Sequence, residues 1–342
     1  WNALLTGYAK HGHNVDALNC FEEMRVEGIA PDPVTLLCCL KACGSIGALD
    51  RGELLHAEID EKGFLETNVT IGNALVDMYA RCGYVAMAEN IFHRVSDPDT
   101  YTWNALLTGY SEHGYALQAI KCFERMQLHD VHLDVVTFIC CLKASSSIQA
   151  MSKGREMHSE IERLGYLERD PEVGNALVDM YVKCGLLEKA QEVFDRLPDR
   201  SIVSWTSLIT GYIEHELAEE AIKCFEQMQL DGIAPDAMAF MTGLKACGSM
   251  GAINKGKEIH IEIERRGLLE QDIVCGKALV DMYAKCSCLD KAQEVFSRLP
   301  IRDVVAWSTL MAGYAQLGES VNVFCVYNRM LEEGVEPDEV VF

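Results

Sequence analysis

An eight-residue stretch recurs at a fixed interval along the 342-residue chain and limits the folds that are open to it. WNALLTGY occupies residues 1–8 and 103–110, and the related WTSLITGY and WSTLMAGY occupy residues 205–212 and 307–314. Each copy begins 102 residues after the previous one and contains one of the four tryptophans. A spacing this regular is typical of a protein that is built from stacked repeats.

Each interval divides into three related modules of 35, 36 and 31 residues. TLLCCLKAC at residues 35–43 marks the second kind of module, and GNALVDMY at residues 72–79 marks the third. Apolar residues recur at helical spacing within a module, as Trp103, Leu106, Leu107 and Tyr110 do, and no β-type alternation occurs. Glycines and Pro-Asp turns end the helical segments. We therefore predict an all-α fold, a right-handed α-solenoid superhelix of two-helix repeats with a groove along its concave side.

Composition sets limits on partners and compartment. The formal net charge of −22 opposes nucleic-acid binding, because phosphate contacts need lysine and arginine. The many glutamates of the second helices are expected to lie on the convex face, away from the groove. No apolar run is long enough for a membrane span, so no membrane partner is expected. Most of the 15 cysteines recur with the repeat, which predicts free, buried thiols and a reducing compartment. The chain opens and stops inside repeats, so we expect it to be a fragment.

Three motifs support a specific resemblance. WNALLTGY followed by CFE and a Pro-Asp turn, LKAC followed by GxxxHxEI, and GNALVDMY followed by AxxVFxRLP are similar to the P, L and S motifs of the pentatricopeptide repeat family. The family occurs in plant organelle RNA editing and processing factors. The resemblance implies P repeats at 1–32 (partial), 100–134, 202–236 and 304–338, L repeats at 33–68, 135–170 and 237–272, S repeats at 69–99, 171–201 and 273–303, and the start of a truncated L repeat at 339–342.

Single-stranded RNA binding is what this resemblance implies, with one base bound by the fifth and last residues of each repeat. The implied base-reading pairs are Asn2 with Asp32, Asn73 with Asp99 and Asn104 with Asp134 for uracil; Asn175 with Ser201 for cytosine; Thr206 with Asp236 and Ser308 with Asp338 for guanine; and Lys277 with Asp303, which departs from the family pattern. The L pairs Leu37/Asn68, Ile139/Asp170 and Met241/Asp272 have apolar fifth residues and are expected to read little. The predicted site is 5′-UxUUxCGxxG-3′.

Further residues are expected to hold the bases and the backbone of the RNA. The resemblance implies base-sandwiching side chains at Tyr101, Val203, Val274 and Val305, and phosphate contacts at Arg81, Lys183 and Lys285. The alternative for the Asn, Thr and Ser side chains is helix N-capping, and the alternative for the cations is an ordinary helix end. Base reading is favoured because near-identical stretches vary at these positions, from Asn104 to Thr206 for example.

Three H-x-E triplets resemble part of a zinc deaminase site, at His56–Glu58, His158–Glu160 and His260–Glu262. The P-C-x-x-C half of that site is missing, and a triplicated active site is not expected, so we interpret them as packing residues. The sequence thus predicts no enzyme, metal or cofactor. We expect a recognition array for single-stranded RNA in a mitochondrion or chloroplast, with proteins of an editing complex as further partners. The alternative is a protein-binding α-solenoid scaffold.

Overall fold

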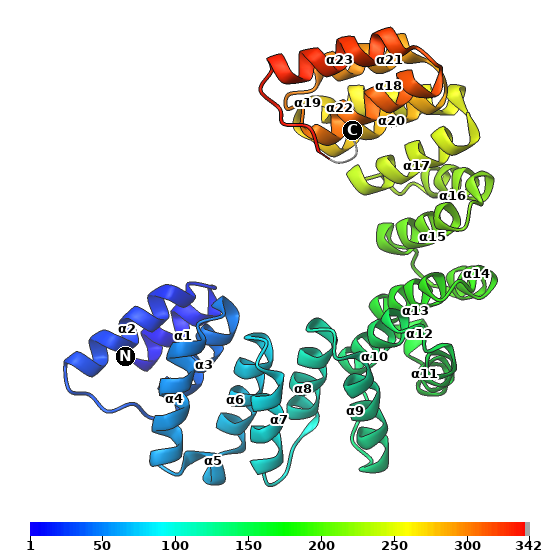
Figure 1. Cartoon of the computed structure of the whole chain (residues 1–342). Helices are drawn as coiled ribbons and strands as arrows, with labels where there is room; N and C mark the ends of the chain where they lie inside the picture. Colours follow the sequence, from blue (N-terminus) through cyan, green and yellow to red (C-terminus); the bar gives the residue numbers. More distant parts are fainter. Residues whose placement is uncertain (339–342) are drawn as a thin grey trace. The chain divides into compact units, whose positions relative to one another are not determined.

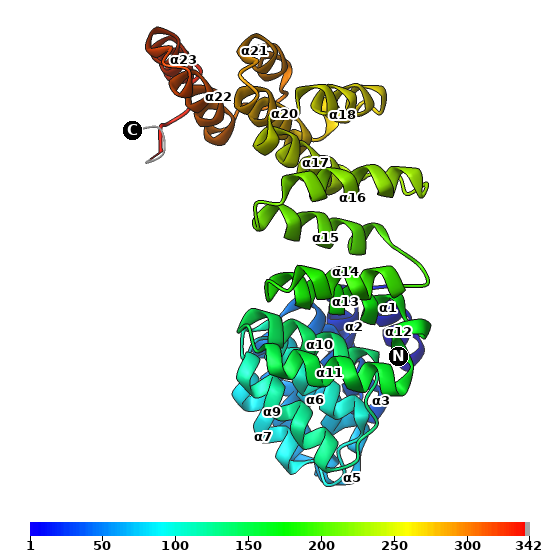
Figure 2. The same ribbon diagram turned by 90° about the vertical axis from the view of Figure 1, so that its right-hand side faces the viewer.

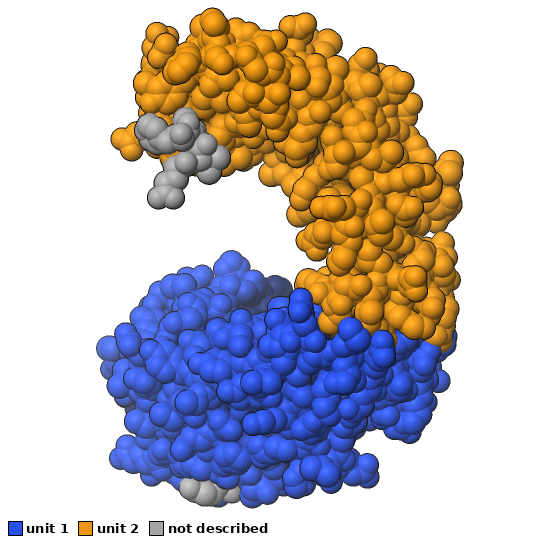
Figure 3. Space-filling view, turned by 45° about the vertical axis from the view of Figure 1, so that its right-hand side comes forward, with its two compact units in different colours: residues 1–176 blue, residues 177–342 orange. Residues whose placement is uncertain are grey.

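The predicted pattern of two helices in each repeat is present along the chain (Figure 1). The computed structural model describes residues 1–338, apart from the side chains of Glu66, Glu270 and Gln271, and the expected truncated repeat at 339–342 lies outside them. The described residues form 23 α-helices and no strand, which confirms the all-α class. The chain divides into two compact units, residues 1–176 and 177–342, shown in blue and orange in Figure 3.

The helices of the first unit can be grouped by the P, L and S repeats that the sequence predicts. They are α1 (Asn2–Lys10), α2 (Asn14–Val26), α3 (Pro33–Ile46), α4 (Leu49–Glu61), α5 (Phe64–Thr67), α6 (Val69–Arg81), α7 (Val85–Arg94), α8 (Thr100–Glu112), α9 (Ala116–Leu128), α10 (Val135–Ser147), α11 (Met151–Leu164) and α12 (Tyr166–Arg169). The unit boundary falls within α13 (Pro171–Lys183).

The second unit repeats the same order. Its helices are α14 (Leu187–Arg196), α15 (Ile202–Glu214), α16 (Ala218–Leu230), α17 (Ala237–Met250), α18 (Ile253–Arg265), α19 (Leu268–Gln271), α20 (Ile273–Lys285), α21 (Leu289–Arg298), α22 (Val304–Gln316) and α23 (Ser320–Glu332). None of the described helices is long and apolar enough to cross a membrane.

The first helix of each repeat packs against the first helix of the next one. In the first unit α1, α3, α6, α8 and α10 form this continuous layer, and in the second unit α15, α17, α20 and α22 do so. Apart from α14, the second helices pack against their own first helices, and most second helices also contact the first helix of the following repeat. In Figure 2, α15, α16 and α17 show this arrangement, lying side by side. Each unit is therefore a stack in which neighbouring repeats share one core.

The recurring tryptophan joins an S repeat to the P repeat that follows it. Trp103 packs edge-on against Phe92 of α7, with ring centroids 4.5 Å apart. Trp205 makes the same contact with Phe194 at 4.5 Å. Trp307 is fully buried in its repeat and also meets a phenylalanine edge-on. Edge-on aromatic pairs stabilise beyond the area that they bury, so these positions fix the junction between the two repeats.

Turns between the helices follow the expected glycine and Pro-Asp signals. Gly28 and Gly114 adopt left-handed backbone angles, with φ of +78° and +79°. In the second P repeat Asp130 takes the left-handed place, at φ +53°. An aspartate starts several of the first helices, as Asp32 does by accepting a hydrogen bond from the N–H of Thr35.

A short third helix closes each L repeat, and the sequence did not predict it. α5, α12 and α19 have four residues each and begin after a left-handed glycine. Each contains one buried leucine, Leu65, Leu167 or Leu269. This leucine anchors the turn that leads into the S repeat. Four residues are too few to show a helical period in a sequence.

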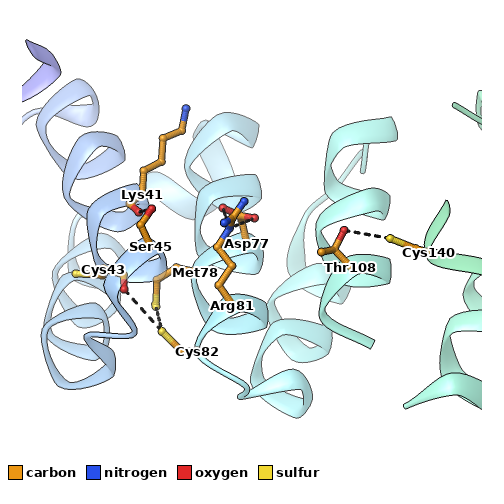
Figure 4. A network of polar contacts seen from close by, with 9 residues as sticks. All are labelled: Lys41, Cys43, Ser45, Asp77, Met78, Arg81, Cys82, Thr108 and Cys140. Carbon is orange, nitrogen blue, oxygen red and sulfur yellow. Dashed lines mark hydrogen bonds and ion pairs between the residues drawn. The ribbon is translucent and has the colours of Figure 1, made fainter. Parts of the chain in front are cut away.

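The cysteines are free thiols, as predicted, and all except Cys325 are buried or half-buried. Burial raises the pKa of the Cys43 thiol to about 11. The Cys82 thiol lies 4.0 Å from the carbonyl oxygen of Cys43 and 4.0 Å from the sulfur of Met78 (Figure 4). Cys43 and Cys82 thus act as small apolar side chains between first helices. Their raised pKa makes both thiols poor nucleophiles.

The glycine of WNALLTGY provides a test of this packing. A Cβ atom at Gly109 would lie 2.7 Å from the Cβ and 3.2 Å from the Cα of Ala80, whereas one at Gly7 would meet nothing within 4 Å. We expect Gly109→Ala to destabilise the first unit by about 1–3 kcal/mol through overpacking. The matched Gly7→Ala should be neutral or stabilise by about 0.5–1 kcal/mol, because alanine favours a helix. Urea denaturation followed by circular dichroism measures both, and equal midpoints would contradict the contact.

Candidate functional site

Consecutive hollows lie along the first helices of the first unit. One has a volume of about 260 Å³ and is lined by Leu37, Lys41, Thr70, Asn73, Ala74, Asp99 and Tyr101. The next has a volume of about 440 Å³ and is lined by Asp77, Arg81, Thr100, Tyr101, Asn104, Ala105, Thr108, Asp134 and Val136. Each hollow contains one predicted Asn/Asp pair, and Tyr101 lines both. The structure thus brings predicted base-reading and base-sandwiching residues together in these two places.

The predicted uracil pairs are hydrogen-bonded within themselves. The amide Nδ2 of Asn2 donates to Asp32 at 2.7 Å, and that of Asn73 donates to Asp99 at 3.1 Å. Nδ2 of Asn104 lies 2.9 and 2.8 Å from the two carboxylate oxygens of Asp134. The fifth residue of one repeat is therefore held by the last residue of the same repeat, at the junction with the next repeat.

A threonine joins each of these pairs, and the sequence analysis missed it. The hydroxyl of Thr102 lies 2.5 Å from Asn73 Oδ1, and that of Thr137 lies 2.8 Å from Asn104 Oδ1. Thr35 occupies the equivalent place, 3.1 Å from the Oδ1 of Asn2. The hydroxyl and N–H of Thr35 also hold the pKa of Asp32 below its usual range, with a smaller effect from Asn2. The presence of threonine at the third position of three consecutive P and L repeats was the available signal.

N-capping explains the last residues of the repeats but not the fifth ones. Asp99, Asp134 and Ser201 are the N-caps of α8, α10 and α15. The fifth residues lie inside the helices that these caps begin, as Asn104 lies in α8. The N-cap alternative for the fifth residues is therefore wrong. The last residues have a structural duty whether or not they bind a base.

The remaining pairs differ in geometry. The hydroxyl of Thr206 donates within its own helix, 2.9 Å from the carbonyl oxygen of Ile202, and Asp236 caps α17. Ser308 likewise donates to the carbonyl oxygen of Val305 at 3.0 Å. Both pairs remain predictions, as does Asn175 with Ser201, whose members belong to different units.

Lys277 forms an ion pair with Asp303, with the ammonium nitrogen 2.9 Å from a carboxylate oxygen. Burial alone would raise the pKa of Asp303, but the hydrogen bonds from Lys277 and from the N–H of Ala306 keep it below its usual range. The lysine therefore occupies the place that an asparagine amide takes in other repeats.

An exposed apolar row accompanies the pairs. Tyr101, Val203, Val274 and Val305, the predicted sandwiching residues, are between 44% and 54% exposed although they are large and apolar. The second residues of the L repeats belong to the same row and were missed: Val34, Val136 and Met238. Their common place, one residue after the start of a repeat, was the available signal. The row remains a predicted contact surface for bases.

The predicted phosphate contacts are already paired with carboxylates. Arg81 Nε lies 3.0 Å from both carboxylate oxygens of Asp77 (Figure 4). Lys183 pairs with Asp179 at 2.8 Å, and Lys285 pairs with its own aspartate one helical turn earlier. Their net positive charge is therefore small, and their phosphate role remains a prediction.

A second set of cations lies on the first helices of the L repeats and was not predicted. Lys41, Lys143 and Lys245 occur at the LKA of each copy, are exposed, and form no ion pair with another described residue. Lys41 lines two hollows, and in Figure 4 its side chain extends away from the helices. The recurrence of LKA was the sequence signal for this set.

The H-x-E histidines pack an L repeat against the following S repeat. Nδ1 of His56 lies 2.9 Å from the hydroxyl of Tyr79, and Nδ1 of His260 lies 2.9 Å from that of Tyr283. Burial lowers the pKa of both histidines. Among the described residues, no group of three or more His, Cys, Asp or Glu side chains is placed to hold a metal ion. This geometry agrees with the interpretation of these histidines as packing residues.

Comparisons with known proteins support the same family. A family model described as the PPR repeat family matches residues 1–45, 98–146 and 200–249, and a model of the PPR repeat matches residues 73–97, 175–202, 277–304 and 305–335. A mitochondrial pentatricopeptide repeat-containing protein of Arabidopsis thaliana is 35% identical over 344 residues, covering 100% of this chain and 33% of the relative. A chloroplastic one from the same plant is 33% identical and is covered over 40% of its length.

Solved structures are similar in fold. The crystal structure of the pentatricopeptide repeat protein PPR10 in complex with an 18-nt psaJ RNA element has a TM-score of 0.73 at 19% identity, covering 99% of this chain and 56% of that chain. PPR10 from maize gives a TM-score of 0.71 at 18% identity over 99% and 54%. The chain spans a third to about half of the length of the first curated relatives. Since the two repeat models together match most of the chain, it belongs to the pentatricopeptide (PPR) repeat family.

Proposed function

We propose that this chain binds single-stranded RNA sequence-specifically along its first helices, with one base in each repeat. The observation that carries the proposal is the succession of hollows in which Asn73/Asp99 and Asn104/Asp134 lie beside the exposed ring of Tyr101. An unstacked base has two apolar faces and one polar edge. Each hollow offers an apolar wall for the faces and a polar pair for the edge.

Known relatives support this proposal in two ways. PPR10, which shares the fold, was crystallised with an RNA element, and several relatives are named mitochondrial or chloroplastic. We infer that the chain is the recognition array of an organelle RNA editing or processing factor, with ten repeats in P, L, S order. Its proposed site is 5′-UxUUxCGxxG-3′, and proteins of an editing complex are its proposed further partners.

The electrostatics of the site are compatible with RNA despite the net charge of −22. The aspartates of the reading pairs cap helix N-termini, where the backbone N–H groups and the helix dipole offset their charge. Their oxygens already accept hydrogen bonds from the Asn side-chain amides. The unpaired ammonium groups of Lys41, Lys143 and Lys245 are the side chains best suited to the phosphates.

A protein-binding scaffold is the second candidate. The acidic net charge and the exposed apolar row favour it, because both suit a basic or apolar peptide. The two functions differ in their response to base sequence, which a protein-binding groove would ignore.

Titration with RNA separates these candidates. The 342-residue chain should bind 5′-UAUUACGAAG-3′ more tightly than a scrambled RNA of the same composition. A base with the wrong polar edge would leave buried polar groups of the hollow without hydrogen-bond partners. Fluorescence anisotropy in low salt measures both affinities. Equal binding to the two RNAs, or binding to neither, would reject sequence-specific recognition and leave the scaffold.

The role of a single reading residue can be tested at Asn104. The substitution Asn104→Thr removes the amide that donates a hydrogen bond to Asp134. It also reproduces the Thr206/Asp236 pair of a later repeat. We expect the preference at the fourth base to change from U toward G, by about tenfold for one good pair. The seventh base, assigned to Thr206, is the internal control. An unchanged U preference at the fourth base contradicts the assignment of the fifth residue.

The unpaired lysines can be tested by salt dependence. Lys41→Gln, Lys143→Gln and Lys245→Gln should each weaken binding to every RNA equally and reduce the slope of log K against log salt by about 0.7. Lys189→Gln is the matched control, because Lys189 lies on a second helix and pairs with Glu192. If the three variants keep the wild-type slope, these lysines do not contact phosphate.

A further inference from the structure

The residue at the third position of each repeat varies with the fifth residue of the repeat before it. A hydroxyl stands at the third position after each of the four asparagines and after no other fifth residue. The pairs are Asn2 with Thr35, Asn73 with Thr102, Asn104 with Thr137, Asn175 with Ser204, Thr206 with Ala239, Lys277 with Ala306, Leu37 with Ile71, Ile139 with Val173, and Met241 with Cys275. The three threonine hydroxyls lie within hydrogen-bond distance of the asparagine Oδ1, whereas that of Ser204 donates to the carbonyl oxygen of Ser201.

Helix capping does not require this hydroxyl. The cap of α17 accepts a hydrogen bond from the backbone N–H of Ala239 at 2.8 Å, and the cap of α22 accepts one from Ala306 at 3.0 Å. Both alanines occupy the third position. Thr102 and Thr137 donate the same backbone bond, and the Thr137 hydroxyl also accepts from the N–H of Asp134 at 3.3 Å in a capping box. These two threonines are fully buried, and their hydroxyls reach the asparagine in front of them.

The hydroxyl and the carboxylate together fix which way the amide points. An ionised carboxylate only accepts hydrogen bonds, so the amide atom that faces Asp99 or Asp134 is Nδ2. The hydroxyl then faces Oδ1 and donates to it. A rotation by 180° would lose the hydrogen bond to the carboxylate and place Oδ1 against it, because an ionised carboxylate can only accept. One lone pair of Oδ1 and one N–H remain for a base in the hollow.

This fixed direction distinguishes uracil from cytosine. Uracil presents a donor at N3 beside an acceptor at O4, whereas cytosine presents an acceptor at N3 beside a donor at N4. An amide that points one way matches the first pattern, and the reversed amide matches the second. Two bases of nearly the same shape are therefore separated by the direction of one amide group.

We propose that the third-position hydroxyl is a positioning residue that holds the asparagine amide in the direction that favours uracil over cytosine. The proposal rests on the proposed RNA binding of these repeats. It makes an Asn/Asp reading unit a set of three residues, such as Asn104, Asp134 and Thr137, with the third one supplied by the following repeat.

Affinities for two RNAs that differ only at the fourth base test this proposal. The two RNAs are 5′-UAUUACGAAG-3′ and the same RNA with C at the fourth position. Both are titrated with the wild-type chain and with the Thr137→Val variant. Valine fits this place, since Val173 occupies the third position of another repeat. We expect the wild-type chain to prefer U by about tenfold and the variant to prefer it by less than about threefold. Thr137→Ser keeps the hydroxyl and should keep the preference.

Other outcomes have separate meanings. The Thr137→Val variant could bind both RNAs more weakly while its ratio of affinities for U and C stays that of the wild-type chain. Such a variant has lost only folding stability, and this outcome overturns the positioning role. An unchanged ratio overturns it as well. If the wild-type chain itself does not distinguish the two RNAs, the proposed base reading fails and the positioning role fails with it. Ala239→Thr is the control, because Thr206 bonds its own helix and should keep its preference at the seventh base.

Discussion

The hydrogen bonds of the aspartate that starts a first helix, as in α3, α8 and α10, connect most features of this chain. Asp134 caps α10, accepts a hydrogen bond from Nδ2 of Asn104 in the repeat before it and lies 3.0 Å from the hydroxyl oxygen of Thr137. Because a cap must sit at the first turn of its helix, the carboxylate can reach the preceding first helix only when the two helices pack closely. Folding of the junction and assembly of the polar pair are therefore the same event.

Close packing of the first helices is in turn set by small side chains. Glycine at position 109 allows α8 to approach Ala80 of α6, and Gly44 allows α3 to approach the backbone of Met78. The hollows follow from this approach, since their walls are side chains that project where two first helices meet. Function in such a stack depends on repeated junctions rather than on a single cleft.

The fold could be predicted from the sequence because its signals are local and recur. Helical spacing, left-handed glycines and Pro-Asp turns each act within a few residues, and the constant interval repeated them. The polar network was harder to foresee, since Thr137 and Asn104 are 33 residues apart and meet only through packing. The four-residue spacing of Asp77 and Arg81 is typical of an ion pair within a helix, and it could have predicted that Arg81 is paired. The four-residue helix α5 is too short to leave a pattern.

The boundary of a sequence repeat and the boundary of a proposed reading unit do not coincide. The fifth and last residues belong to one repeat, whereas the hydroxyl that completes the set belongs to the next. Exchange of whole repeats, by recombination or by engineering, therefore separates an asparagine from its hydroxyl and joins it to whatever residue heads the new neighbour. A breakpoint placed just after the third residue would transfer the complete set. Array proteins of this kind should thus be divided for exchange inside the first turn of a helix rather than in the loop before it.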